Sequence, residues 1–173
     1  MRKTTAAISS QKTIVTREEG ERNYVTSEQP WDLKDVLLDF TNPQPKDWIT
    51  SGLRFGRGPA QTGELLFGKE KSSPLEGIVI EDAAHSGLDS DHFTGILRTP
   101  TFEITSDTIW YRYRGNAKVF LVVDSYRCGA EPGSVHHGKH LFRTLEGNRD
   151  YRWESHRIAR YLGHRVHVEF TPE

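Results

Sequence analysis

The strongest constraint on the fold is a period-two alternation of apolar and polar side chains in the second half of the chain. Residues 108–114 read Thr-Ile-Trp-Tyr-Arg-Tyr-Arg, so Ile and Tyr fall on one side of an extended segment and Trp and Arg on the other. Residues 165–170 repeat the alternation as Arg-Val-His-Val-Glu-Phe. The segment 118–124 is the most apolar run and is predicted to be the central strand. Short strands separated by turn residues predict an all-β protein, an antiparallel β-sandwich or jelly roll.

The first half of the chain is less regular. Residues 1–30 are polar and predict a flexible tail or linker, which leaves residues 31–173 as the sandwich module. Residues 31–40 fit either a helix or a first strand. Frequent glycines from residue 48 to 77 favour short strands and loops, and residues 128–150 are predicted to form a long loop.

Composition excludes several classes of protein. The net charge of -1 provides no basic surface for nucleic acid. No stretch approaches the roughly 20 apolar residues of a membrane helix, and the N-terminus lacks the apolar run of a signal peptide. The single cysteine, Cys128, cannot form an internal disulfide.

A set of landmarks from residue 36 to 173 carries a family resemblance. The landmarks are Gly52-Leu53-Arg54-Phe55-Gly56, Ala84-His85-Ser86-Gly87-Leu88, Gly95-Ile96-Leu97-Arg98-Thr99-Pro100-Thr101-Phe102, Tyr111-Arg112-Tyr113-Arg114-Gly115, Leu121-Val122-Val123-Asp124 and Gly163-His164-Arg165-Val166-His167-Val168-Glu169-Phe170. Their order and spacing resemble the β-sandwich module embedded in planctomycete cytochrome-c-type multidomain proteins. The set is also similar to accessory modules of secreted levanase-type glycoside hydrolases.

The resemblance implies a galactose-binding-like jelly roll in an extracytoplasmic (periplasmic or secreted) protein of larger size, concerned with polysaccharide use. It implies a polysaccharide or oligosaccharide and the neighbouring domains of the parent protein as partners. Two departures qualify it. The chain has no Cys-x-x-Cys-His sequence for covalent haem. Family members continue past the segment 166–170 with a further strand, so the module is expected to lack its last strand and to leave a sheet edge unpaired.

Carbohydrate binding needs aromatic faces for sugar C–H groups and polar side chains for hydroxyls. Such residues gather around the predicted long loop and on one face of the segment 108–114. The candidates are Tyr126, Arg127, His136, His137, Trp153, Trp110 and Arg112. The alternative for Trp110 and Trp153 is a place in the sandwich core, and for Tyr126 and Arg127 a structural pair at a strand end.

Metal binding has a weaker basis in the sequence. The resemblance implies a fold class in which a structural Ca²⁺ is typical, and carboxylate oxygens suit that ion. The candidate ligands are Glu81, Asp82, Asp89 and Asp91. No EF-hand spacing accompanies them, and solvated acidic loops are the alternative. No other cofactor is expected.

Three functions follow as hypotheses. The first is a non-catalytic carbohydrate-binding module, and the second is a structural spacer between domains, which predicts an exposed apolar patch. The third is a polysaccharide-active enzyme. It has least support, because no nucleophile elbow, phosphate loop or dinucleotide fingerprint occurs. The sequence therefore predicts a binding protein and not an enzyme.

Overall fold

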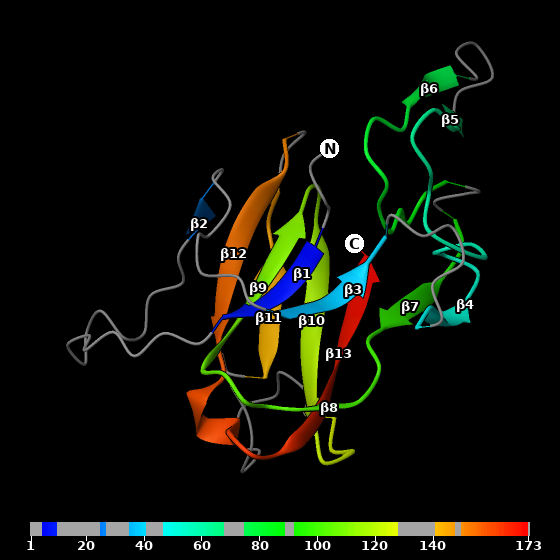
Figure 1. Cartoon of the computed structure of the whole chain (residues 1–173). Coiled ribbons are helices and arrows are strands. Elements are labelled where there is room, and N and C mark those ends of the chain that lie inside the picture. Colours follow the sequence, from blue (N-terminus) through cyan, green and yellow to red (C-terminus); the bar gives the residue numbers. More distant parts are fainter. Residues whose placement is uncertain are drawn as a thin grey trace.

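The computed structural model is an all-β protein built from two antiparallel sheets and a separate two-stranded ribbon (Figure 1). Within the part described, helical structure is confined to a 3-10 turn at Ala159–Tyr161. The residues that the structure describes are 5–9, 25–26, 35–40, 47–67, 75–88, 92–127, 141–147 and 150–172.

Sheet A has the strand order β2-β12-β9-β1-β3, and each neighbouring pair is antiparallel. Its strands are β2 (Val25–Thr26), β12 (Arg152–Arg157), β9 (Thr108–Tyr113), β1 (Thr5–Ser9) and β3 (Asp35–Asp39). The longest pairing joins β9 to β12, with Tyr111 opposite Glu154 and Arg112 opposite Trp153. Pairing of these two strands fixes which side chains share a face.

Sheet B has the strand order β11-β10-β13-β7-β4, with β8 on the far end of β13. Its strands are β11 (Phe142–Leu145), β10 (Ala117–Val123), β13 (Arg165–Pro172), β7 (Gly95–Arg98), β4 (Ile49–Gly52) and β8 (Phe102–Glu103). β13 has β10 on one side and β7 and β8 on the other. β13 therefore has neighbouring strands on both of its sides.

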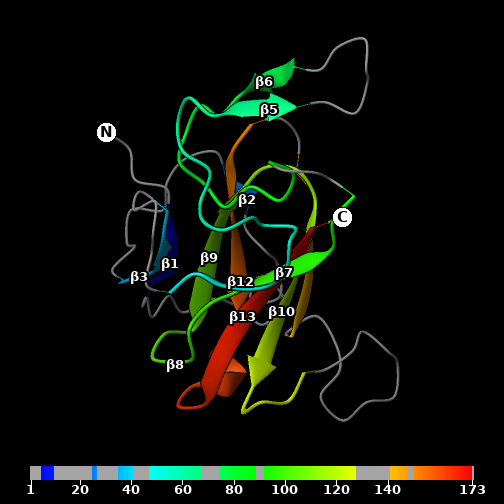
Figure 2. The same cartoon turned by 90° about the vertical axis from the view of Figure 1, so that its right-hand side faces the viewer.

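Alternating side chains from both sheets form one buried core, which confirms the predicted sandwich. Figure 2 shows the strands of the two sheets in a second view. Sheet A contributes Ile109 and Tyr111, and sheet B contributes Val119, Leu121 and Val168, all of them buried. Complete burial of one such aliphatic side chain stabilises the fold by about 1.5–3 kcal/mol. The finer prediction of a galactose-binding-like jelly roll stays a prediction.

The structure revises several local predictions. Two segments of the stretch 1–30, predicted as a tail, are the strands β1 and β2, and β1 pairs on both of its sides. The ambiguous stretch 31–40 contains a strand, β3, with Leu38 buried. The predicted loop 128–150 contains β11, which is paired with β10. These strands are short, so neighbouring strands rather than their own patterns determine them.

The ribbon of β5 (Leu65–Phe67) and β6 (Leu75–Ile78) projects from one end of the sandwich in both views (Figures 1 and 2). In the described residues, no helix is long and apolar enough to cross a membrane.

Candidate functional site

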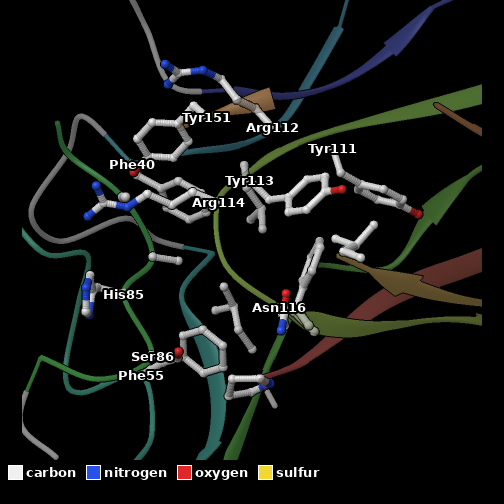
Figure 3. A pocket seen from close by; sticks show the side chains of 18 residues that line it. Phe40, Phe55, His85, Ser86, Tyr111, Arg112, Tyr113, Arg114, Asn116 and Tyr151 are labelled. Carbon is white, nitrogen blue, oxygen red and sulfur yellow. The ribbon is translucent and has the colours of Figure 1, made fainter. Parts of the chain in front are cut away.

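A pocket of about 180 Å³ opens at one end of the sandwich, where β9 turns into β10 (Figure 3). It lies between the two sheets and is bordered by β3 and by the segments around Phe55 and His85. A cavity of ~150 Å³ holds a single benzene ring, so this pocket has room for one six-membered ring. Ligand sites in proteins favour such concave, largely apolar places.

The walls of the pocket are mostly apolar. Six aromatic rings line it, together with Leu38, Leu97, Leu145 and Ala117. The rings belong to Phe40, Phe55, Tyr111, Tyr113, Tyr151 and Phe170. Tyr111 meets Phe170 edge to face, with ring centroids 5.7 Å apart, across the two sheets. The inner wall is thus built from core residues and is held by the packing of the sandwich.

Two tyrosine hydroxyls bond to partners in β12. The Tyr111 hydroxyl lies 2.8 Å from Nδ1 of the fully buried His156, and the Tyr113 hydroxyl donates to Glu154 Oε2 at 2.8 Å. Burial raises the pKa of both tyrosines above the usual range, and for Tyr113 the bond to Glu154 adds to the rise. Both groups remain protonated at neutral pH. Because the hydroxyls are engaged with β12, the rings offer the pocket chiefly their carbon surfaces.

Polar groups gather at the mouth of the pocket, on Arg112, Arg114, His85, Ser86 and Asn116. Figure 3 shows Arg114 and His85 on one side of the pocket and Tyr111 on the other. An apolar interior with a few polar groups at the rim is the usual arrangement of a site that binds and orients a small ligand.

The two arginines share one aromatic neighbour. The guanidinium carbon of Arg112 lies 4.3 Å from the centroid of the Tyr151 ring, and that of Arg114 lies 5.1 Å from it. Both are cation–π contacts, which favour a fixed position of the guanidinium over the ring. Arg112 also forms an ion pair with Glu81, with Nη1 2.6 Å from Oε2.

Local hydrogen bonds orient two further groups of the mouth. Asn116 Oδ1 accepts a hydrogen bond from the Gly147 amide at 3.1 Å. A side chain at Gly147 would place Cβ 2.3 Å from the Gly115 carbonyl oxygen, so this close approach requires glycine. His85 Nδ1 accepts a hydrogen bond from the Gly87 amide at 3.1 Å. In the neutral imidazole the proton is therefore on Nε2, which is the hydrogen-bond donor.

The structure brings together three of the residues predicted from the sequence. Trp110, Arg112 and Trp153 share one face of sheet A, because Trp153 pairs with Arg112 and Trp110 with Ser155 in the β9–β12 register. Only Arg112 reaches the pocket. Trp153 is 3% exposed, so its ring is not available to a ligand, but it is buried on the face of sheet A that lies opposite Ile109 and Tyr111 and not in the core between the sheets.

Tyr126 and Arg127 lie at the opposite end of β10. Ala117 at the start of this strand lines the pocket, whereas Tyr126 bridges back to Val123 at its end, about 20 Å away at ~3.3 Å per residue. Arg127 pairs with Glu169 at 2.7 Å and lies 4.1 Å above the Phe120 ring. These are the contacts of a structural pair. His136 and His137 lie outside the described residues, as does Cys128.

Of the four predicted calcium ligands, only Glu81 and Asp82 lie in the described residues, and each of them has another partner. Glu81 pairs with Arg112, and Asp82 Oδ1 accepts hydrogen bonds of 2.8 Å from both the amide and the hydroxyl of Thr62. Asp89 and Asp91 lie outside the described residues. Across the described ranges, no three His, Cys, Asp or Glu side chains group together as metal ligands do. Calcium binding stays a prediction without support from this geometry.

Sequence reasoning missed most of the pocket. Tyr151, His85, Phe40 and Phe55 come from four separate segments, and no local pattern links them. The one available signal was the pair Arg112 and Arg114 on alternate positions of a strand that ends in a turn. Comparisons of the chain with protein-family models, with curated proteins and with solved structures find no match.

Proposed function

We propose that this chain is a non-catalytic carbohydrate-binding module and that the pocket at the β9–β10 end takes one sugar ring. The observation that carries the proposal is the combination of six aromatic rings in the walls with arginine, histidine, serine and asparagine groups at the mouth. Sugars present C–H faces that pack on aromatic rings and hydroxyls that need hydrogen-bonding groups. The volume of about 180 Å³ suits a terminal or single residue better than a long chain segment.

We propose binding without catalysis because of the residues that line the pocket. Glycoside hydrolysis needs two carboxyl groups facing the bond that breaks. The described residues that line the pocket include no Asp or Glu. The nearest carboxylates that the hydrogen bonds identify, Glu81 and Glu154, are engaged with Arg112 and Tyr113. The family resemblance adds the expectation of an extracytoplasmic parent protein that presents the module to a polysaccharide.

The test is binding of the folded chain to an array of poly- and oligosaccharides, followed by pocket variants. Ala84→Phe places a ring in the pocket, because Ala84 lines it, and is expected to abolish binding. Tyr126→Ala is the matched control, since Tyr126 is 52% exposed at the other end of the sandwich. Absence of binding to every glycan, or loss of binding in Tyr126→Ala with retention in Ala84→Phe, would refute the proposed site.

A second function, a structural spacer, is favoured by one observation. The projecting ribbon exposes Leu65, Leu75 and Ile78 to 46, 50 and 52%, and Ile80 beside it to 66%. Exposed apolar side chains grouped in this way mark contacts with other protein surfaces. If the spacer function holds, the chain binds no glycan, and Leu65→Thr with Ile78→Thr weakens its contact with the adjoining domain of the parent protein, measured by hydrogen exchange at the ribbon.

A further inference from the structure

Among the described residues, the mouth of the pocket carries more positive than negative charge. Arg112 has Glu81 as its ion-pair partner, and the two side chains are only 13 and 33% exposed. For Arg114, no Asp or Glu of the described residues lies within ion-pair distance, and none lines the pocket with it. The described mouth therefore carries the positive charge of the half-buried Arg114 without a described carboxylate beside it, and a charge interaction at a partly buried group is stronger than in open water.

The Arg114 guanidinium is also held in place before any ligand arrives. It lies over the Tyr151 ring, which Arg112 contacts as well. Two guanidinium groups on one ring repel each other, and an anion beside them reduces this repulsion. A guanidinium offers two parallel N–H donors, which match the two oxygens of a carboxylate.

From these observations we infer that the pocket is selective for a sugar that carries a carboxylate, a uronic acid, and that Arg114 binds this carboxylate. The inference rests on the proposed function and names its ligand class. In the complex the sugar ring packs among the aromatic walls, and its carboxylate points to the side of the mouth where Arg114 and His85 lie (Figure 3). A neutral sugar of the same shape loses the charge-assisted bonds and leaves Arg114 uncompensated.

The experiment titrates the folded chain with three probes, galacturonate, galactose and benzoate, and follows binding by ¹H–¹⁵N NMR. Galacturonate is expected to bind about 10- to 100-fold more tightly than galactose, because a hydrogen bond to a charged group contributes roughly that factor. Its affinity is expected to fall as salt rises from 50 to 500 mM, with little change for galactose.

The variants assign the effect to a residue. Arg114→Gln is expected to lower galacturonate affinity to the galactose level, and Arg114→Lys to keep part of the preference through charge alone. Arg160→Gln is the matched control, because Arg160 is exposed in the 3-10 turn that follows β12, whereas Tyr151 precedes that strand. It removes the same charge and is expected to leave the preference intact.

The outcomes separate the two proposals. Equal binding of galactose and galacturonate overturns the inference and leaves the carbohydrate function standing. Benzoate that binds as tightly as galacturonate overturns the assignment to a sugar. If none of the three binds to the folded chain, the inference fails, and the glycan array decides the carbohydrate function. If Arg114→Gln keeps the full preference for galacturonate over galactose, the role of Arg114 is overturned. If that variant does not fold, the titration of the wild-type chain with the two sugars decides the preference.

Discussion

Removal of one hydroxyl, in Tyr111→Phe, separates the stability of the sandwich from the function of the pocket. The Tyr111 hydroxyl lies 2.8 Å from His156 Nδ1, and the two residues are 2 and 0% exposed. Phenylalanine keeps the ring that lines the pocket and the edge-to-face contact with Phe170. The substitution therefore deletes a buried hydrogen bond and leaves the wall of the pocket in place.

The expected loss follows from what remains behind. The imidazole of His156 stays buried and loses this hydrogen bond, and removal of one partner of a buried hydrogen bond costs about 1–3 kcal/mol. The cavity left by one oxygen adds little. For a domain of this size 1 kcal/mol corresponds to ~2–4 °C in Tm. Tyr111→Phe is therefore expected to lower Tm by about 2–12 °C, with ligand affinity unchanged.

Urea unfolding followed by tryptophan fluorescence measures the change in free energy, and the NMR titration measures affinity. Tyr151→Phe is the control, because in the described part of the chain no hydrogen bond joins its hydroxyl. Its effect on stability is expected to stay within about 0.5 kcal/mol. The reasoning fails if Tyr111→Phe is as stable as the wild type, or if it loses ligand binding while the fold is retained.

Three further predictions concern pH and backbone geometry. Burial raises the pKa of Tyr113 and Tyr151, whereas tyrosine in the unfolded chain ionises near pH ~10. The free energy of unfolding is therefore expected to be unaffected by these two groups below that pH and to fall as pH rises beyond it. A declining Tm together with tyrosine absorbance at 295 nm measures the effect. The hydrogen bond from His164 lowers the pKa of Asp124, so any advantage in Tm of the wild type over Asp124→Asn is present above pH ~4 and shrinks as pH falls further; a pH-independent difference contradicts this. Gly52 has φ +77° and a Cβ there would lie 2.3 Å from a backbone carbonyl oxygen, so Gly52→Ala is expected to cost about 1–3 kcal/mol in urea unfolding, and a neutral effect would refute the strain.

The all-β class was predictable because the long strands carry their own pattern. β9, β10 and β13 alternate or run apolar over six to eight residues, and burial of Ile109, Leu121 and Val168 follows that pattern. β1, β2 and β11 have two to five residues and little contrast between their faces. Their pairing depends on neighbours far along the chain, which sequence periodicity does not report.

The candidate site was predictable only in one residue. Arg112 belonged to the expected set, and the structure places it at the pocket. Trp153 and Tyr126 have the aromatic character that sugar binding needs, but Trp153 is buried away from the pocket and Tyr126 is at the far end of β10. Composition indicates which side chains suit a ligand, whereas only the strand register determines which of them meet.

The position of the pocket follows from the geometry of strands. In the middle of a sheet, successive residues face opposite sides, so two neighbours cannot line one cavity. Here four successive residues, Tyr111 to Arg114, all line the same pocket. At the end of β9, Tyr111 and Tyr113 face the interior, whereas Arg112 and Arg114 lie on the opposite face of the strand, where both contact the Tyr151 ring. The same alternation that builds the apolar core therefore supplies both the aromatic wall and the cationic mouth, and it can combine them only where the sandwich ends.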